Sequence, residues 1–555
     1  MKRMVDRFTI RRVVLVCVVI ALTVGVSGFV IPSDSDYFFK INKSINVFGR
    51  VYKEIAANYV DEVDPERFMQ AGIEGLLGTL DPYTVYIDKE DSDEVDLLTH
   101  GKYGGIGVTI GKRGKSIQVL TVMDGYSAQR QGVLPGDRIL QVDGIPVGKR
   151  LDNVRTLTRG EPGTEVRVLI EREGELSPIE FVLIREEIKL RNVTYSDYVD
   201  EEIAYIRLER FSRRTGEEVR QAIKALKLRG EFKGLVLDLR GNPGGLLDAA
   251  VDVVSKFVPK GSLIVSTKGR RSNADKRYLS VEEPLVSGVP MIVLTDHSSA
   301  SASEIVAGSL QDLDRALVVG TRTFGKGLVQ TILPLNYGAQ LKITTARYYI
   351  PSGRSIQEID YMDKDGNGVF TIVPDSLKRE FKTANGRTVH EYGGITPDST
   401  VEGEELGPMV KALYRKSLFF KFSNKFTAGG YDTSFTKVTG EILETFREFL
   451  EEENFDYQEE CDETVKELKQ IAERSHYSDR VLKDLDLLAS ALAKEKDRGF
   501  DRYIDRIRQE LNVVLMERIA GEKGKIEASL EEDVQLEVAI GVLKDSKVYE
   551  RKINP

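Results

Sequence analysis

The sequence predicts a multidomain protein in which an α/β domain and a small β-rich module lie between two helical regions. The chain has 555 residues, which is too many for a single hydrophobic core. Strand-like runs alternate with amphipathic helical segments across residues 190–400, a pattern typical of an α/β fold. Short runs rich in β-forming residues, divided by Gly, Pro, Asp and Asn, occupy residues 102–187.

The N-terminus has the pattern of a targeting segment. Five basic residues and one acidic residue occupy positions 1–12, and the uncharged apolar run 13–31 follows. At ~1.5 Å per residue a helix over this run reaches about 28 Å, which is enough to span a bilayer. We therefore expect residues 1–31 to be a signal peptide or an uncleaved signal-anchor, with a buried core helix as the alternative. The positive-inside rule then puts the rest of the chain in the periplasm or on the outer face of the cytoplasmic membrane.

Residues 40–100 are expected to form a small helical region. Apolar residues such as Val47, Val51 and Ile55 recur at helical spacing, and the turn-forming string LDPYT follows at residues 80–84. The next module, residues 102–187, contains the strand-like runs YGGIGVTI, SIQVLTV, DRILQVDGIPV, EVRVLIER and IEFVLI. Two helical pieces, SAQRQG and LDNVRTLTRG, interrupt these runs, so we expect a compact barrel.

In the α/β domain, residues 190–400, strands such as GLVLDL and PMIVLT end on the loops DLRGNPGG and TDHSSAS. The ends of strands are where α/β folds place their ligand sites. Residues 401–555 are helical and highly charged, with Leu at three- and four-residue spacing. We find no chemistry in this C-terminal helical domain, and we interpret it as stabilising the protein or as an assembly surface for a homo-oligomer.

Composition excludes several classes of function. The net charge of −9 argues against a nucleic-acid binder, because phosphate contacts need a concentrated basic surface. There are only four histidines, far apart, and neither an HExxH nor a CxxC motif, so we expect no metal and no cofactor. Cys17 lies in the N-terminal apolar run and Cys461 near the other end, so a disulfide is not expected to hold the fold together.

The string SASASEIVAGSL follows the strand PMIVLT and begins a helix. A serine at that position lies where backbone N–H groups favour negative charge, as a nucleophile requires. Alanines around it leave space for a substrate backbone. The alternative is a helix-capping serine with close packing of small residues.

Lys326, between two glycines in TRTFGKGLVQ, is the candidate base. An ordinary lysine is protonated, but burial among apolar residues lowers the pKa of a lysine by several units, which makes it able to accept a proton. A serine–lysine pair also suits a chain that is poor in histidine. His297 precedes Ser301 by only four positions, which is too close along the chain for a triad base to face the hydroxyl.

The module of residues 102–187 resembles a PDZ domain, on the order of its strands and helices and on the strings YGGIGV and GVLPGDRILQVDG. In PDZ domains a peptide adds a strand to the open sheet edge, and the glycine-rich loop holds the peptide's C-terminal carboxylate. The resemblance assigns this carboxylate-binding role to Gly105, Ile106, Gly107 and Val108.

Residues 47–398 resemble the carboxyl-terminal (tail-specific) processing proteases, which are PDZ-containing serine endopeptidases with a crotonase-like α/β core. The strings that carry the resemblance are LDPYTVYI, LDLRGNPGGLL, SSASASEIVAGSLQD, GTRTFGKGLVQ and GGITPD. The resemblance implies that Ser301 is the nucleophile, that Lys326 is the base and that Gln330 orients Lys326. RGN stands where the family often has R-N-N, and the resemblance does not cover residues 401–555.

The same resemblance implies an oxyanion hole made by the backbone N–H groups of Gly245 or Gly244 and of Ala302. It predicts an endopeptidase that captures the apolar C-terminal tails of protein or peptide substrates with its PDZ domain and cleaves nearby. Two alternatives are a catalytically silent PDZ peptide-binding protein and an acyl-thioester enzyme of crotonase type. The intact Ser301, Lys326 and Gln330 argue against the first, and the PDZ module has no explanation in the second.

Overall fold

The computed structural model describes residues 34–89, 101–148, 151–364, 370–372, 374, 378–428 and 437–554. The predicted signal or anchor segment, residues 1–31, lies outside this range, as does His100. No helix in the described part of the chain is long and apolar enough to cross a membrane. The described residues fall into two compact units, divided after Thr79.

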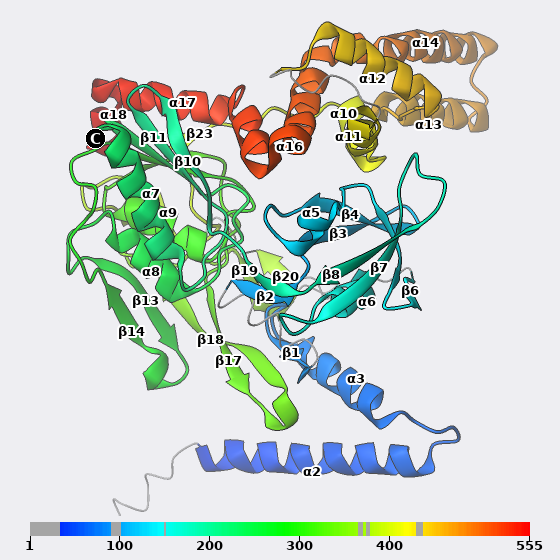
Figure 1. The fold of residues 1–555 in the computed structure, drawn as a ribbon. Helices are drawn as coiled ribbons and strands as arrows, with labels where there is room; N and C mark the ends of the chain where they lie inside the picture. The colour runs from blue at the N-terminus through cyan, green and yellow to red at the C-terminus, as the bar shows by residue number, and fades with distance from the viewer. Residues whose placement is uncertain are drawn as a thin grey trace, which may run out of the picture. The chain divides into compact units, whose positions relative to one another are not determined.

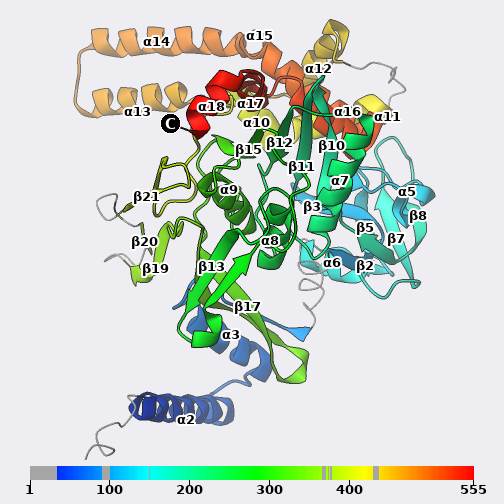
Figure 2. The same cartoon turned by 90° about the vertical axis from the view of Figure 1, so that its left-hand side faces the viewer.

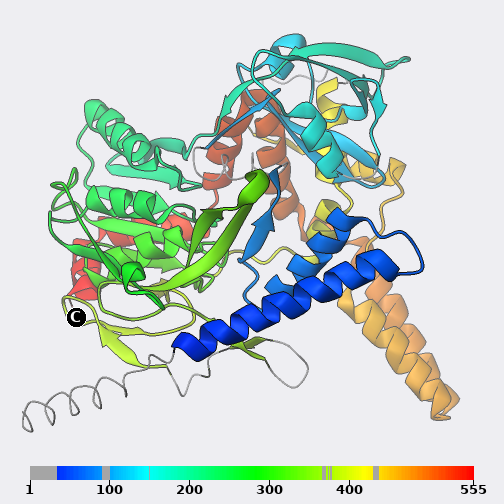
Figure 3. The same cartoon turned by 90° about the horizontal axis from the view of Figure 1, so that it is seen from below.

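The first unit contains the helices α2 (Asp34–Asn58) and α3 (Pro65–Leu77). Asp64 caps α3, because its carboxylate accepts hydrogen bonds from the backbone N–H groups of Glu66 and Arg67. The rings of Tyr52 and Phe68 pack against each other with centroids 5.0 Å apart, so the two helices contact each other at the turn between them. Figure 3 shows α2 as one continuous helix. The predicted helical region is therefore present up to Leu77.

The second unit begins with a short strand and the β-rich barrel. Within the predicted residues 102–187, six strands form one sheet. Five of them follow the order β3-β4-β5-β7-β8, and the short β6 pairs with β5 (Figure 1). Its core is apolar and includes Val142, Val154, Ile170 and Leu183. The elements are β2 (Lys102–Gly105), β3 (Val108–Arg113), β4 (Ser116–Val122), α5 (Ser127–Gln131), β5 (Arg138–Val142), β6 (Ile145–Pro146), α6 (Leu151–Thr158), β7 (Glu165–Glu171), β8 (Ile179–Ile184) and β9 (Glu186–Lys189).

The α/β core is built on a six-stranded sheet in the order β10-β11-β12-β15-β16-β23. All neighbouring strands in it are parallel except β10 and β11. Helices α7, α8 and α9 contribute to the hydrophobic core on one face of this sheet (Figure 2). The elements are β10 (Val193–Asp200), β11 (Ile203–Leu208), α7 (Thr215–Arg229), β12 (Gly234–Asp238), α8 (Leu247–Ser255), β15 (Met291–Thr295), α9 (Ala302–Asp312), β16 (Leu317–Gly320) and β23 (Ser399–Thr400).

A second, antiparallel sheet runs in the order β1-β18-β13-β14, with β17 also paired to β18. Its strands are β1 (Val85–Ile87), β13 (Leu263–Gly269), β14 (Lys276–Leu279), β17 (Leu328–Pro334) and β18 (Gln340–Tyr349). Strand β1 follows LDPYT in a region predicted to be helical, and it adds to the edge of β18 instead. The remaining short elements are η2 (Ser272–Ala274), η3 (Asn336–Gly338), β19 (Ile359–Lys364), β20 (Phe370–Ile372), β21 (Glu380–Lys382) and β22 (Thr388–His390).

The region predicted as one C-terminal helical domain divides into two parts in the structure. The first part, α10 to α16, has a hydrophobic core of its own that is rich in Phe. The helices that contribute to this core are α10, α11, α12, α15 and α16. The last two helices, α17 and α18, pack on the face of the α/β sheet opposite α7–α9 (Figure 1). The elements are α10 (Pro408–Arg415), α11 (Leu418–Ala428), α12 (Gly440–Glu452), α13 (Glu460–Arg474), α14 (Asp479–Asp497), α15 (Gly499–Arg502), α16 (Ile504–Leu530), α17 (Val534–Lys544) and α18 (Ser546–Ile553).

Candidate active site

The candidate residues gather at the carboxyl ends of the parallel strands. Phe211 follows β11, Gly244 follows β12, Ser301 follows β15 and Lys326 follows β16. Because neighbouring parallel strands end at the same edge of a sheet, these four loops meet there. Phe211 N–H donates to the carbonyl oxygen of Gly244 (3.2 Å), and a Cβ on Gly244 would lie 2.9 Å from Cβ of Ser301.

The three serines of SASAS differ in what their hydroxyl groups contact. Ser299 Oγ is buried and donates to the carbonyl oxygen of Leu239 (2.9 Å), and buried Ser303 Oγ donates to that of Asn242 (2.9 Å). Ser301 is half-buried. Its Oγ accepts a helix-capping contact from the backbone N–H of Glu304, and it donates to no group in the described part of the chain. Of these serines, only Ser301 has a hydroxyl available to an external group.

The backbone of Ser301 is strained. Its φ is 56° and its ψ is −112°, and helix α9 begins at the next residue. Such a conformation is sparsely populated by residues with a side chain and costs about 1–3 kcal/mol unless its surroundings hold it in place. The side chain is thereby presented at a sharp strand-to-helix turn, which is the geometry expected of an exposed nucleophile.

Glu304 connects the loop of Ser301 to the loop of Lys326. Its buried carboxylate accepts four hydrogen bonds: Oε2 accepts from the backbone N–H groups of Ser301 (2.8 Å) and Lys326 (2.9 Å), and Oε1 from Gly325 N–H (2.6 Å) and Thr323 Oγ1 (2.6 Å). Burial raises the pKa of Glu304 to about 7, and the four donors oppose that rise. One carboxylate therefore fixes the relative positions of the two loops.

Tyr348 adds a second connection between the same loops. Its hydroxyl oxygen lies 2.6 Å from the carbonyl oxygen of Lys326 and 3.1 Å from that of Ser301. Tyr348 belongs to β18 and is buried, so the antiparallel sheet contacts both loops through this side chain.

Lys326 has the environment expected of a base. Burial, helped by the positive charge of Lys342, lowers the pKa of Lys326 to about 8, while Glu304 and Asp81 oppose that change. The ammonium Nζ lies 4.0 Å from the centroid of the Tyr83 ring. No hydrogen bond joins Nζ to Ser301 Oγ within the described residues. In structures without substrate such catalytic hydrogen bonds are often not yet formed.

Gln330 lies on β17, close behind the lysine loop. Its amide Nε2 donates to Thr344 Oγ1 (3.2 Å), and no hydrogen bond joins the Gln330 side chain to Lys326 within the described residues. The expected role of Gln330 in orienting Lys326 stays a prediction.

The two glycines after β12 differ as candidate oxyanion donors. Gly244 N–H donates to Asn242 Oδ1 (2.9 Å), so this donor is already occupied. Gly245 N–H and Ala302 N–H have no acceptor among the described residues. Gly244 has φ 95°, and a Cβ there would lie 2.5 Å from the carbonyl oxygen of Ala300, so only glycine fits. The geometry favours Gly245 and Ala302.

The predicted carboxylate loop of the PDZ module lies between β2 and β3. The backbone N–H groups of Ile106 and Gly107 donate to no described residue. The carbonyl oxygen of Ile106 accepts from Ala128 N–H of α5 (3.1 Å), and that of Gly107 accepts from Met123 N–H, directly after β4 (2.8 Å). Gly107 has φ 81°, and a Cβ there would lie 2.4 Å from Cβ of Tyr126. Gly105 belongs to β2, Val108 begins β3, and α6 lies against β3.

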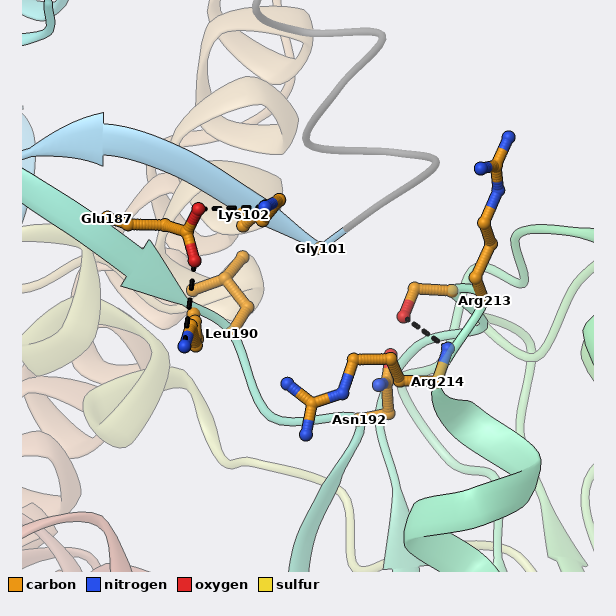
Figure 4. Close-up of a pocket in the computed structure, with 9 residues that line it drawn as sticks. Gly101, Lys102, Glu187, Leu190, Asn192, Arg213 and Arg214 are labelled. Atoms are coloured by element: carbon orange, nitrogen blue, oxygen red, sulfur yellow. Dashed lines mark hydrogen bonds and ion pairs between the residues drawn. The ribbon is translucent and has the colours of Figure 1, made fainter. Parts of the chain in front are cut away.

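A pocket of ≈ 380 Å³ lies where the PDZ module joins the α/β core (Figure 4). It is lined by the entry to the module (Gly101, Lys102), by the exit from it and by the loop Ser212–Arg214. Glu187 pairs with Lys102 (2.7 Å), and a Cβ on Gly101 would lie 3.3 Å from Ser212 Oγ. Because Ser212 follows Phe211, the attachment of the PDZ module is adjacent to the loop that carries Gly244 and Gly245.

His297 is exposed on the loop after β15 and contacts neither Ser301 nor Lys326, so the structure does not bring it into the site. No group of His, Cys, Asp and Glu within the described ranges is arranged to hold a metal ion. Sequence reasoning missed Glu304 and Tyr83. The spacing S-x-x-E of Ser301 and Glu304 is a helix-start signal that could have identified the first. No local signal connects Tyr83 to Lys326.

Comparison with known proteins identifies each part of the chain. The model for peptidase family S41 matches residues 202–365, and a PDZ-domain model matches 118–172. The model "Probable PDZ-protease, C-terminal helical domain" matches residues 409–543, and "Activating protease CtpB N-terminal domain" matches 32–91. All four regions thus have counterparts in PDZ-containing proteases.

Three known proteins illustrate the similarity. A carboxy-terminal-processing protease of Bartonella bacilliformis is 40% identical over 57% of this chain and 73% of its own length. The carboxy-terminal processing protease CtpB of Bacillus subtilis is 30% identical over 75% of this chain and 88% of its own length. The solved photosystem II D1 C-terminal processing protease is 27% identical, with a TM-score of 0.35 over 64% of this chain and 92% of its own length.

The fold and these matches define a serine peptidase of family S41 that carries a PDZ domain. The chain belongs to the carboxy-terminal processing proteases. The family resemblance, the fold class and the enzyme class that the sequence predicts are confirmed.

Proposed function

We propose that this protein is an endopeptidase that uses Ser301 as nucleophile and Lys326 as general base, and that its PDZ domain selects substrates by their apolar C-terminal tails. The observation that carries the proposal is the difference between the three serines. Ser299 and Ser303 donate to backbone carbonyl groups, whereas no described group accepts the hydroxyl proton of Ser301, which lies on the loop that Glu304 ties to Lys326.

Catalysis begins with the neutral form of Lys326, which a pKa of about 8 makes accessible near neutral pH. Its Nζ moves into contact with Ser301 and accepts the Oγ proton while Oγ attacks the scissile carbonyl carbon. The lysine then returns that proton to the leaving amine as the peptide bond breaks. Water hydrolyses the resulting acyl-enzyme by the same proton transfers in reverse order. Gln330 orients Lys326 once its amide leaves Thr344.

The oxyanion that forms during attack is stabilised by the backbone N–H groups of Gly245 and Ala302. Both donors are unengaged within the described chain, and Ala302 N–H is at the start of α9, where helix N–H groups favour negative charge. Gly244 supports this site by its positive φ and not as a donor, because Asn242 already accepts its hydrogen bond.

Substrate selection resides in the loop Gly105–Val108 and the edge of β3. The unengaged N–H groups of Ile106 and Gly107 suit a terminal carboxylate, and the edge of β3 next to α6 suits the preceding apolar residues. Occupancy of this groove acts on catalysis through the attachment of the PDZ domain at Gly101 and Ser212, which adjoins the loop of Gly244 and Gly245. A ligand gates activity in this way only if it binds the aligned arrangement better than the resting one.

Residues 1–31 place the protein outside the cytoplasm, in the periplasm or anchored on the outer face of the cytoplasmic membrane. A serine endopeptidase in that compartment acts on exported or membrane-attached protein substrates. The helical regions provide surfaces for a homo-oligomer. The second candidate, a silent PDZ peptide-binding protein, does not account for the intact Ser301, Lys326 and Gln330.

The nucleophile is tested by comparing Ser301→Ala with Ser299→Ala and Ser303→Ala on a peptide with an apolar C-terminal tail. We expect Ser301→Ala to lose all cleavage while keeping its melting temperature and its binding of the tail. A Ser301→Ala protein that still cleaves the peptide would overturn the assignment. A wild-type protein that binds the peptide but never cleaves it would favour the alternative, a catalytically silent PDZ peptide-binding protein.

The gating role is tested with two peptides that differ only in ending as a free acid or as an amide. We expect the free acid to be cleaved faster, and Gly107→Leu to remove this preference, because a side chain there collides with Tyr126. Equal rates for both peptides would mean that the carboxylate loop does not control cleavage.

A further inference from the structure

The LDPYT string forms a turn that is closed by its own aspartate. Asp81 Oδ1 accepts hydrogen bonds from the backbone N–H groups of Tyr83 (3.0 Å) and Thr84 (3.0 Å), and Thr84 Oγ1 donates to Asp81 Oδ2 (3.1 Å). Directly after the turn, Val85 pairs with Lys342 as β1 joins β18. The position of Tyr83 is therefore set by a closed turn on one side and a strand pairing on the other.

This turn delivers the Tyr83 ring to the catalytic lysine. Nζ of Lys326 lies 4.0 Å from the ring centroid. The hydroxyl end of the Tyr83 ring is also held, because the hydroxyl oxygens of Tyr83 and Tyr361 are 3.1 Å apart. The two rings meet edge to face with centroids 5.7 Å apart. Tyr83 thus has little freedom to move away from Lys326.

The same turn reaches the partner predicted to orient the lysine. Thr84 is buried, and its Oγ1 accepts a hydrogen bond from Thr344 N–H (3.2 Å). Thr344 Oγ1 in turn accepts from Gln330 Nε2 (3.2 Å). Tyr83 therefore contacts Lys326 directly, and its neighbour Thr84 is connected to Gln330 through Thr344.

We propose that Tyr83 is a positioning residue of the protease, whose ring is the wall against which the side chain of Lys326 is held beside Ser301. The inference rests on the proposed function, in which Lys326 is the general base. It assigns a role to the LDPYT turn, which lies before the PDZ domain in the chain and far from the serine and lysine strings.

The physical reason lies in the flexibility of lysine. A lysine side chain has four rotatable bonds, and ordering it costs up to about 2 kcal/mol, so a base on such a chain needs a contact that limits its positions. An aromatic face attracts the ammonium form and remains an apolar wall for the neutral form. The ring also keeps water from the amine on that side, which adds to its burial. The other charged or titratable groups facing Lys326 are Lys342, Glu304 and Asp81.

The test compares Tyr83→Leu with Tyr83→Phe, and uses Tyr86→Leu on the same segment as a matched control. We expect Tyr83→Leu to lower kcat/KM by about 10- to 100-fold, mainly through kcat, because the base loses its position. Water then reaches the amine, so the midpoint of the rise of kcat/KM with pH moves upward from about 8. Tyr83→Phe keeps the ring and should retain wild-type values of both quantities, as should Tyr86→Leu.

Each outcome decides the question. Wild-type kcat/KM and midpoint in Tyr83→Leu would overturn the inference, and so would a Tyr83→Phe protein as impaired as Tyr83→Leu, since the hydroxyl would then be the acting group. If Tyr83→Leu has a lowered melting temperature, Tyr83→Met, whose unbranched and more flexible side chain adapts to gaps and also lacks an aromatic face, carries the same expectation. Lys326→Ala separates the two proposals: cleavage by that variant would refute the proposed function and not the role of Tyr83 alone.

Discussion

At the residue scale, the site depends on one strained serine and one buried carboxylate. Ser301 has a positive φ that its side chain disfavours, and Glu304 accepts the hydrogen bond from its N–H in that conformation. Because the other carboxylate oxygen accepts from Thr323 and Gly325, the same group also fixes the lysine loop. Glu304 is therefore a positioning residue, since its fully buried carboxylate holds the loops of Ser301 and Lys326.

Removing this carboxylate tests that conclusion. In Glu304→Gln an amide NH₂ replaces one oxygen, so at least one backbone N–H of Ser301, Gly325 or Lys326 faces another donor. We expect kcat/KM to fall by about 100-fold, the loss typical of a misplaced catalytic group, with tail binding unchanged. Steady-state kinetics together with peptide binding to the PDZ domain would check this. Near-normal kinetics would show that the backbone contacts of the two loops suffice without the carboxylate.

The pH dependence of cleavage follows from the charges around Lys326. Burial and the charge of Lys342 lower the pKa of Lys326 to about 8, so activity should rise with pH through this value as the base loses its proton. In Lys342→Met the neighbouring positive charge is gone, the ammonium form is less disfavoured, and the midpoint should move to higher pH. The pH profile of kcat/KM measures the shift, with Lys268→Met on the same sheet as control. A midpoint that moved downward would contradict this account.

At the element scale, the C-terminal helices contact the PDZ domain through Arg518 and Phe420. Arg518 of α16 donates from Nη2 to the carbonyl oxygen of Pro135 (3.2 Å), and its guanidinium lies 5.4 Å from the centroid of the Phe420 ring. Arg113 of the PDZ domain contacts the same ring, with 5.7 Å to its centroid. Burial lowers the pKa of Arg518 to about 10.

Arg518→Ala should loosen this contact without unfolding either domain. A lost hydrogen bond from a charged group costs about 1.5–3 kcal/mol, so amide hydrogen exchange in the PDZ loop Leu134–Asp137 should be about tenfold faster or more. Arg508→Ala, which removes an exposed arginine of the same helix, should leave the exchange of this loop unchanged. Equal protection in Arg518→Ala would mean that the helices do not hold the PDZ loop.

At the scale of the whole molecule, the last two helices belong to the α/β core. Leu536 and Leu543 of α17 and Tyr549 and Ile553 of α18 are buried against the sheet. Tyr549 Oη also lies within hydrogen-bond distance of the backbone of Met291 on β15. The chain thus returns to the protease core after it has built the intervening helical region.

Deleting residues 534–555 should therefore destabilise the protease core. Each large apolar side chain contributes about 1.5–3 kcal/mol when buried, so losing four of them approaches the ~5–15 kcal/mol that stabilises a typical domain. Replacing Glu460–Asp497 by a short Gly-Ser linker is the matched control, because none of the described side chains of α14 is buried and Tyr457 lies close to Lys496 at the base of the hairpin. Thermal unfolding should show a large loss for the first variant only.

The sequence by itself determined the fold class and the enzyme class. Strands and helices of the PDZ module and of the α/β core follow from hydrophobic periods and turn residues, which are local properties of the chain. Small residues around Ser301 at a helix start, and Lys326 between two glycines, are equally local signals. Together with the family resemblance, these signals predict Ser301 as the nucleophile and Lys326 as the base.

Only the tertiary structure decided which groups are free and which are held. Ser299 and Ser303 donate their hydroxyl protons to backbone carbonyl groups, which distinguishes Ser301 from them. Gly244 N–H donates to Asn242, which distinguishes Gly245 from Gly244. The tertiary structure also brings Tyr83 against Lys326 and places α17 and α18 on the sheet. These contacts join residues that are far apart in the chain, and no local periodicity records them, because they depend on which surfaces meet when separately formed elements pack together.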